Sequence, residues 1–194
     1  VWQRAVKVGL SCLPDTFETG KDQLPWAMVE NRPFLRACHG LGLEYLERGR
    51  VEQALDVFED MLAMNPGDNQ GIRALAIDCY FRLGDPEGVL EICELYPDDA
   101  MEQVLYGRAL ALYQLGRKAK AQDALDEALK WLPLVGKELA KKRHRRPKGR
   151  HVDFVVYGGA EQAYLYWKDQ GQYWKDTPGA IEWVRACLQE RREG

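Results

Sequence analysis

Leu35–Asp68 reads LRACHGLGLEYLERGRVEQALDVFEDMLAMNPGD, the pattern of two helices joined by a tight turn. Its small, aromatic and helix-breaking residues follow a fixed order: Leu41, Gly42, Tyr45, Gly49, Ala54, Phe58 and Pro66. A similar order returns in Glu102–Leu134, with Ala109, Leu112, Gly116, Ala121, Leu125, Ala128 and Pro133. A repeat of roughly 34 residues of this kind predicts a helical hairpin, which can bury its apolar face only by stacking on neighbours.

The rest of the chain is predicted to add one hairpin and two flanking regions. Three hairpins are expected within 35–133, at 35–68, 70–96 and 100–132. An N-terminal flanking helix and connector are predicted for 1–34, and a basic loop with an aromatic helical cap for 134–194. We therefore expect an all-α fold, a right-handed α-solenoid of helical hairpins with a C-terminal helical cap.

The composition is that of an ordinary globular protein. Of the 194 residues, 46% are hydrophobic and 29% are charged, which argues against wholesale disorder. No apolar run approaches the roughly 18 residues that cross a bilayer, and no signal-peptide pattern follows Val1, so no membrane partner is expected. The five cysteines are scattered and lack a CxxC pair, which favours buried free thiols in a reducing compartment, the cytoplasm.

Charge is distributed unevenly along the chain. Seven basic residues lie within ten positions, with no acidic residue among them: Lys141, Lys142, Arg143, Arg145, Arg146, Lys148 and Arg150. Without them, 20 basic residues face 30 acidic ones, a net charge of −10. Clustered cations of this kind bind nucleic acid or another polyanion through counterion release. The alternatives are a solvated loop, or a segment that lies on the acidic remainder of its own or a second chain.

Residues that could carry chemistry are few. The three histidines, His39, His144 and His151, do not have the spacing of metal ligands, and Ser11 is the only serine. Gly158 and Gly159 lack the strand–turn–helix setting of a phosphate cradle. The sequence therefore predicts no metal, no cofactor and no enzymatic activity.

The set Leu41, Gly42, Tyr45, Ala54, Phe58 and Pro66 resembles the tetratricopeptide repeat, over roughly Leu35–Pro133. Two further stretches, Glu30–Phe34 and Gly158–Gly159 followed by Trp174 and Pro178, are similar to suppressor-of-tumorigenicity-7-type repeat proteins and to related bacterial proteins. The tetratricopeptide resemblance implies an α-solenoid whose first helices line a concave groove that binds peptides or partner proteins.

The residues predicted to line this groove are Arg36, His39, Leu43, Tyr106 and Tyr113. Spacings of three and four residues place the first three on one helical stripe, opposite Leu41 and Tyr45. Arg36, His39 and Tyr106 are expected to give polar specificity. Leu43 and Tyr113 are expected to give apolar contact. The sequence thus predicts a non-catalytic scaffold for protein–protein interaction. Nucleic-acid binding through 141–150 and self-association are the alternatives.

Overall fold

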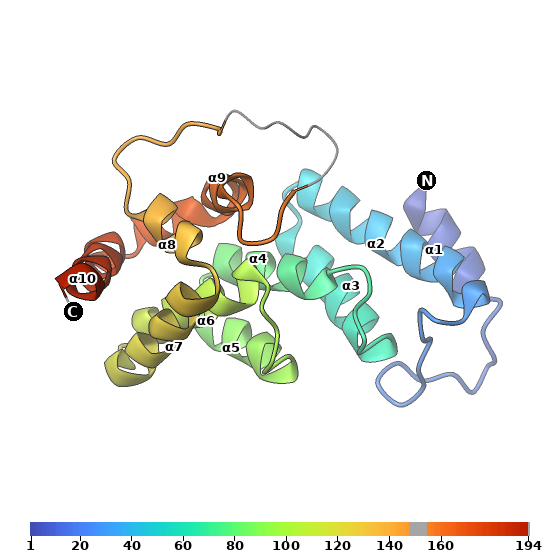
Figure 1. Ribbon diagram of the computed structural model, residues 1–194. Coiled ribbons are helices and arrows are strands. Elements are labelled where there is room, and N and C mark those ends of the chain that lie inside the picture. The colour runs from blue at the N-terminus through green and yellow to red at the C-terminus, as the bar shows by residue number, and fades with distance from the viewer. Residues whose placement is uncertain (148–154, 194) are drawn as a thin grey trace. The chain divides into compact units, whose positions relative to one another are not determined.

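The computed structural model describes residues 1–147 and 155–193 (Figure 1). Within these ranges every regular element is a helix, and the only β-type pairing is an isolated bridge between Thr19 and Asp22. The all-α prediction is confirmed for this part of the chain. Contacts divide the molecule into two compact units, Val1–Asp85 and Pro86–Gly194. This division falls inside the range 35–133, which the sequence analysis treated as one array of hairpins.

The first unit consists of four α-helices that pack in chain order. They are α1 (Trp2–Leu10), α2 (Arg32–Glu47), α3 (Val51–Met64) and α4 (Ile72–Leu83), and the short 3-10 helix η1 (Val29–Asn31) precedes α2. Each helix contacts the next: α1 lies against α2, α2 against α3 and α3 against α4.

Local chemistry sets where these helices begin and end. Pro33 lies in the first turn of α2, where its missing N–H costs nothing. Gly49 takes a φ of 70° between α2 and α3, a conformation that glycine adopts without a Cβ penalty. The Asp68 carboxylate accepts the backbone N–H groups of Ile72 and Arg73 at 2.7 and 2.9 Å, so it caps the start of α4.

The core of the first unit lies where α2 crosses α3. Leu35, Ala54 and Phe58 are completely buried. A Cβ added at Gly42 would lie 2.3 Å from Phe58 Cε1, so the two helices approach closely only because this position has no side chain. The connector docks on the same core, because Leu24 is buried and its N–H donates to Met64 O at 2.7 Å.

The described part of the second unit contains six α-helices. They are α5 (Pro86–Leu95), α6 (Glu102–Gln114), α7 (Lys118–Trp131), α8 (Pro133–Leu139), α9 (Ala160–Asp176) and α10 (Ala180–Glu193). Helix α6 contacts α5, α7 and α9, and α8 contacts α7, α9 and α10. Ala121 lies on α7, which packs against α6. It is completely buried, as the hairpin pattern requires.

Helix α8 departs from the sequence prediction, which began the basic loop at residue 134. Pro133 stands at the start of this helix rather than ending the preceding one, since its fixed φ suits a first helical turn. Val135 and Leu139 are buried, and their burial holds the short helix against the unit. The basic loop therefore begins only after residue 139.

Candidate functional site

The five predicted groove residues fall in different units. Arg36, His39 and Leu43 lie on α2 of the first unit, and Tyr106 and Tyr113 lie on α6 of the second. The α2 residues present side chains to solvent, whereas the α6 residues are used inside their own unit.

The assignment of Tyr106 to a groove is wrong. Its side chain is completely buried and packs against the rings of Tyr166 and Trp174, with centroid distances of 5.6 and 6.3 Å. The hydroxyl donates to Leu132 O at 2.8 Å and accepts the Gly136 N–H at 2.9 Å. Burial raises the pKa of this phenol well above its ordinary range. Tyr106 thus joins α6 to the α7–α8 connection and is not exposed to a partner.

Tyr113 is covered in part by the C-terminal helices. Its ring stacks on Trp183 of α10 with a centroid distance of 4.7 Å, and its hydroxyl donates to Pro178 O at 3.3 Å. These contacts occupy the apolar face that was expected to meet a partner. The face of α6 is therefore an attachment surface for the end of the chain.

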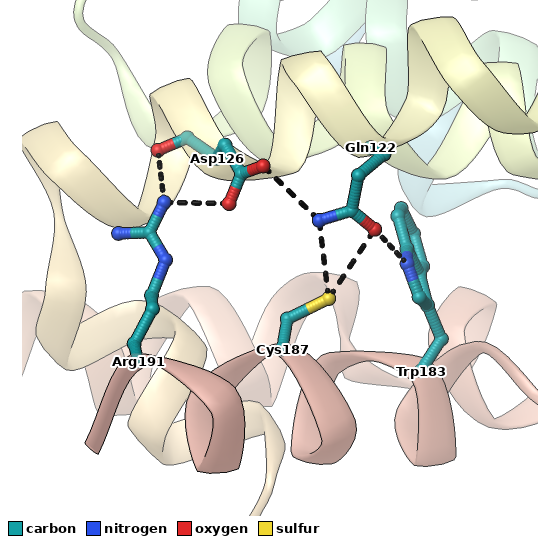
Figure 2. Close-up of polar contacts among 5 residues, drawn as sticks. All are labelled: Gln122, Asp126, Trp183, Cys187 and Arg191. Carbon is teal, nitrogen blue, oxygen red and sulfur yellow. Dashed lines mark hydrogen bonds and ion pairs between the residues drawn. The ribbon is translucent and has the colours of Figure 1, made fainter. Parts of the chain in front are cut away.

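A polar network fixes α10 beside α7, as Figure 2 shows. The Gln122 amide oxygen accepts Trp183 Nε1–H at 2.9 Å, and its nitrogen lies 3.3 Å from Cys187 Sγ. Arg191 pairs with the Asp126 carboxylate at 2.6 Å and also donates to its backbone oxygen at 3.0 Å. Partial burial acts to raise the pKa of Asp126, but hydrogen bonds from Arg191 and Gln122 outweigh it and lower that pKa. Each of these side chains has a partner within the network, which joins α7 to α10.

Helix α2 of the first unit carries an exposed cation, Arg36, that lies over an aromatic ring. The guanidinium carbons of Arg32 and Arg36 each lie 5.3 Å from the centroid of the Trp26 ring. Arg32 is anchored through its Nε–H to Trp26 O at 2.9 Å, whereas Arg36 is exposed. Such cation–π contacts stabilise the orientation of a guanidinium by about 0.5–1 kcal/mol at exposed sites.

His39 and Leu43 continue this surface along α2. The Nδ1 atom of His39 lies 3.2 Å from the amide nitrogen of Gln70, and the ring is half-buried. Desolvation lowers the pKa of His39, and the negative charge of Asp68 offsets this only in part. The imidazole is therefore neutral near pH 7. Leu43 has 38% of its surface exposed, a large fraction for a leucine on a packed helix. We define Arg36, His39 and Leu43, with Trp26, as the α2 surface.

Part of the predicted basic patch is held by acidic groups of its own unit. Lys141 pairs with Glu138, and Arg146 pairs with Glu161 at 2.6 Å. His144 contacts Glu138 at 3.0 Å and stacks on the Trp167 ring with a centroid distance of 3.6 Å. The remaining cations of the patch divide into two sets: Lys142, Arg143 and Arg145 are exposed, and Lys148 and Arg150 lie outside the described residues.

The protein-family model described as "Transcriptional repressor TCF25" matches residues 2–192. The chain belongs to this family. No curated protein and no solved structure matches it. The TCF25 match begins in α1 and ends in α10, so it includes helices of both units.

The identification as a tetratricopeptide repeat protein is therefore wrong, since the matching family is TCF25 and extends well beyond the hairpins. The weaker likeness to suppressor-of-tumorigenicity-7-type proteins has no support either. The residues behind both resemblances have a local explanation. Two antiparallel helices need a small residue where they cross, as Gly42 shows against Phe58, and a breaker such as Gly49 between them. Helix pairs of many families meet these requirements.

Three of the buried thiols of this TCF25 family member are not activated for chemistry. Burial raises the pKa values of Cys38, Cys79 and Cys93 to about 12, so these thiols are protonated at neutral pH. Cys187 is also buried, and Cys12 is exposed. Within residues 1–147 and 155–193, no group of three or more His, Cys, Asp or Glu side chains is arranged to hold a metal ion. No helix in the same ranges is long and apolar enough to span a bilayer.

Proposed function

We propose that this member of the TCF25 family is a non-catalytic protein-interaction module in the regulation of transcription, and that its first unit binds a partner protein through the α2 surface. The family description supports the role in transcription. The α2 surface supports the interaction, because it is the predicted binding stripe whose side chains stay accessible.

One observation carries this proposal. Arg36 is exposed and oriented by the Trp26 ring, and no acidic residue of the described ranges forms an ion pair with it. His39, about one helical turn after Arg36, adds a neutral polar group. Leu43, about two turns after Arg36, adds an exposed apolar group. The opposite side of α2 buries Leu35, Cys38 and Leu41 in the core. The surface therefore offers an unpaired cation beside apolar area, and these are features of energetically important interface residues.

The expected contribution of Arg36 to the affinity for a partner follows from the hydrogen bonds that its guanidinium can donate. A charge-assisted hydrogen bond from Arg36 to a partner carboxylate would contribute about 1.5–3 kcal/mol. This corresponds to a loss of about 10- to 100-fold in affinity when the arginine is truncated.

Site-specific photo-crosslinking tests this proposal. A photoreactive amino acid at Leu43 should crosslink to a partner protein in cell extract, whereas the same group at Gln53, exposed on α3, should not. Arg36→Ala should remove the Leu43 crosslink, and Arg48→Ala should leave it, because Arg48 is already paired with Glu44 at 2.5 Å. Equal crosslinking from Leu43 and Gln53 would refute the assignment of the surface.

A reporter assay tests the role in transcription separately. The whole chain, fused to a heterologous DNA-binding domain, should lower expression of a reporter gene, and Arg36→Ala should relieve this effect. A role in transcription also requires the protein to enter the nucleus, in addition to the cytoplasm predicted from its sequence. Cell fractionation measures the distribution between the two compartments.

The solenoid arrangement of hairpins is also part of the proposal. Sequential packing of α1 to α4 and of α5 to α7 supports it within each unit. Small-angle X-ray scattering should give the elongated profile of a superhelical stack, and a spherical profile would contradict it.

A second function, binding of nucleic acid, has support from the basic patch. Lys142, Arg143 and Arg145 are exposed and close in sequence. With about −0.9 per cation, these three would give a log–log salt slope of about −3, and Lys148 and Arg150 would raise its magnitude to about 4.5. Absence of binding to duplex and single strands at low salt would remove this function.

A further inference from the structure

A cavity of about 490 Å³ opens in the second unit, between the α5–α6 connection and the segment that leads into α9. Its polar lining consists of Asp99, Glu102, Tyr157 and Gln162, and Val155 and Leu165 are among its apolar lining residues. It does not include any residue of the α2 surface. A cavity of this size accommodates one long side chain with adjacent backbone.

Hydrogen bonds hold the two sides of this cavity together. The Tyr157 hydroxyl donates to Ala100 O at 2.8 Å, across the opening from its own segment. The buried Gln162 side chain bridges further inside: its oxygen accepts the Gly158 N–H at 2.6 Å, and its nitrogen donates to Glu102 Oε2 at 2.6 Å. The carboxylate of Glu102 is thereby fixed in position by groups of α9 and of the preceding turn, which is the preorganisation that a binding site needs.

Glu102 brings a negative charge to the lining of this cavity. Glu102 accepts hydrogen bonds from the neutral amides of Gln103 and Gln162, and no Lys, Arg or His of the described residues forms an ion pair with it. Asp99 adds a second carboxylate to the lining. The pKa of Tyr157 is raised, first by partial burial and then by the charges of Glu102 and Asp99. A half-buried carboxylate without a cation costs solvation free energy, which a cationic ligand would recover.

We propose that this cavity binds the side chain of a lysine or arginine presented by a basic segment of a partner protein. Apolar walls such as Val155 and Leu165 fit the aliphatic stem of such a side chain, and Glu102 and Asp99 fit its charged head. The site lies in the second unit and is independent of the function proposed for α2. Each can therefore fail without the other.

Peptide titrations on the whole chain test both halves of this match. The probe is a capped Gly/Ser peptide with one central lysine. One control peptide carries norleucine, which keeps the stem without the charge, and another carries 2,4-diaminobutyric acid, which keeps the charge on a shorter stem. Binding is followed by NMR shifts of the Gln162 side-chain amide and the Gly158 N–H, two groups that line or border the cavity. We expect saturable shifts with the lysine peptide and with its arginine counterpart, and binding weaker by about tenfold or more for both controls.

Protein variants assign the charge to Glu102. Glu102→Gln keeps the size and an oxygen for Gln162, and should weaken lysine-peptide binding by about tenfold. Asp123→Asn, an exposed acid on α7, removes the same charge elsewhere and should leave binding unchanged. The far-UV circular dichroism and melting temperature of both variants verify that they are folded. If Glu102→Gln does not fold, the norleucine comparison on the unaltered protein decides. Equal binding of the lysine and norleucine peptides, or stronger binding of the latter, would overturn the proposal, as would shifts confined to residues away from the cavity.

Discussion

Replacement of Tyr106 by phenylalanine removes one buried hydroxyl group from the core of the second unit and tests how much that group stabilises it. The variant retains the ring between Tyr166 and Trp174 and removes only the hydroxyl that joins Leu132 O to Gly136 N. Leu132 O keeps the Val135 N–H at 3.1 Å, so loss of the first bond costs about 0.5–1.5 kcal/mol. Gly136 is buried, and its N–H loses the Tyr106 acceptor, which costs a further 1–3 kcal/mol or so. We expect destabilisation of about 1.5–4.5 kcal/mol in total.

Thermal and urea denaturation followed by circular dichroism measure this effect. In a chain of this size, about 1.5–4.5 kcal/mol lowers the melting temperature by roughly 3–18 °C. If the two units unfold in separate transitions, only that of the second unit should move. Tyr113→Phe is the matched control, because its hydroxyl makes one long, exposed hydrogen bond, of 3.3 Å, to Pro178 O. A Tyr106→Phe shift no larger than that of the control would refute the burial argument. The crosslink from Leu43 should be unaffected by Tyr106→Phe, since Tyr106 is not part of the α2 surface.

Three further predictions concern packing, titration and the C-terminal helix. Gly42→Ala should destabilise the first unit by about 1–3 kcal/mol in urea denaturation, because its methyl group would overlap the Phe58 ring. Burial raises the pKa of Tyr166 far above 10, the value of a free phenol. The free energy of unfolding of the second unit should therefore be unaffected by this group below pH 10 and should fall as the pH rises further. Ultraviolet absorbance should show Tyr166 ionising only when the second unit unfolds. Arg191→Ala should cost at most about 1 kcal/mol, because its pair with Asp126 is partly exposed, and hydrogen exchange should accelerate in α10 alone. The first prediction would be contradicted by a urea midpoint that Gly42→Ala leaves unchanged. The second would be contradicted by ionisation of Tyr166 before the second unit unfolds, and the third by faster hydrogen exchange throughout that unit.

On α6, the spacing of residues predicts the helix but not the exposure of its faces. Spacing of three and four residues marked Tyr106 and Tyr113 as one stripe of a helix, and both do lie on α6. Whether that stripe meets solvent depends on α9 and α10, which follow more than 40 residues later and cover it. On α2 the same spacing placed Arg36 and Leu43 at the surface, because within the first unit the main helical contacts of α2 are with α1, α3 and η1. The cavity at Glu102 has no sequence signal of its own, since its lining comes from two segments separated by about 50 residues.

Helix periodicity, small residues at crossings and breakers between helices are local properties, and from them the amino-acid sequence alone determined that the protein is helical and that Ala54 and Ala121 are buried. The same local rules hold for unrelated helix pairs, and for that reason they suggested the wrong family. Only the tertiary structure decided which helical faces remain open, which cations are neutralised by Glu138 and Glu161, and that no cation of the described residues forms an ion pair with Glu102. Each of these depends on contacts between residues far apart in the chain, where burial and charge are set jointly by several elements.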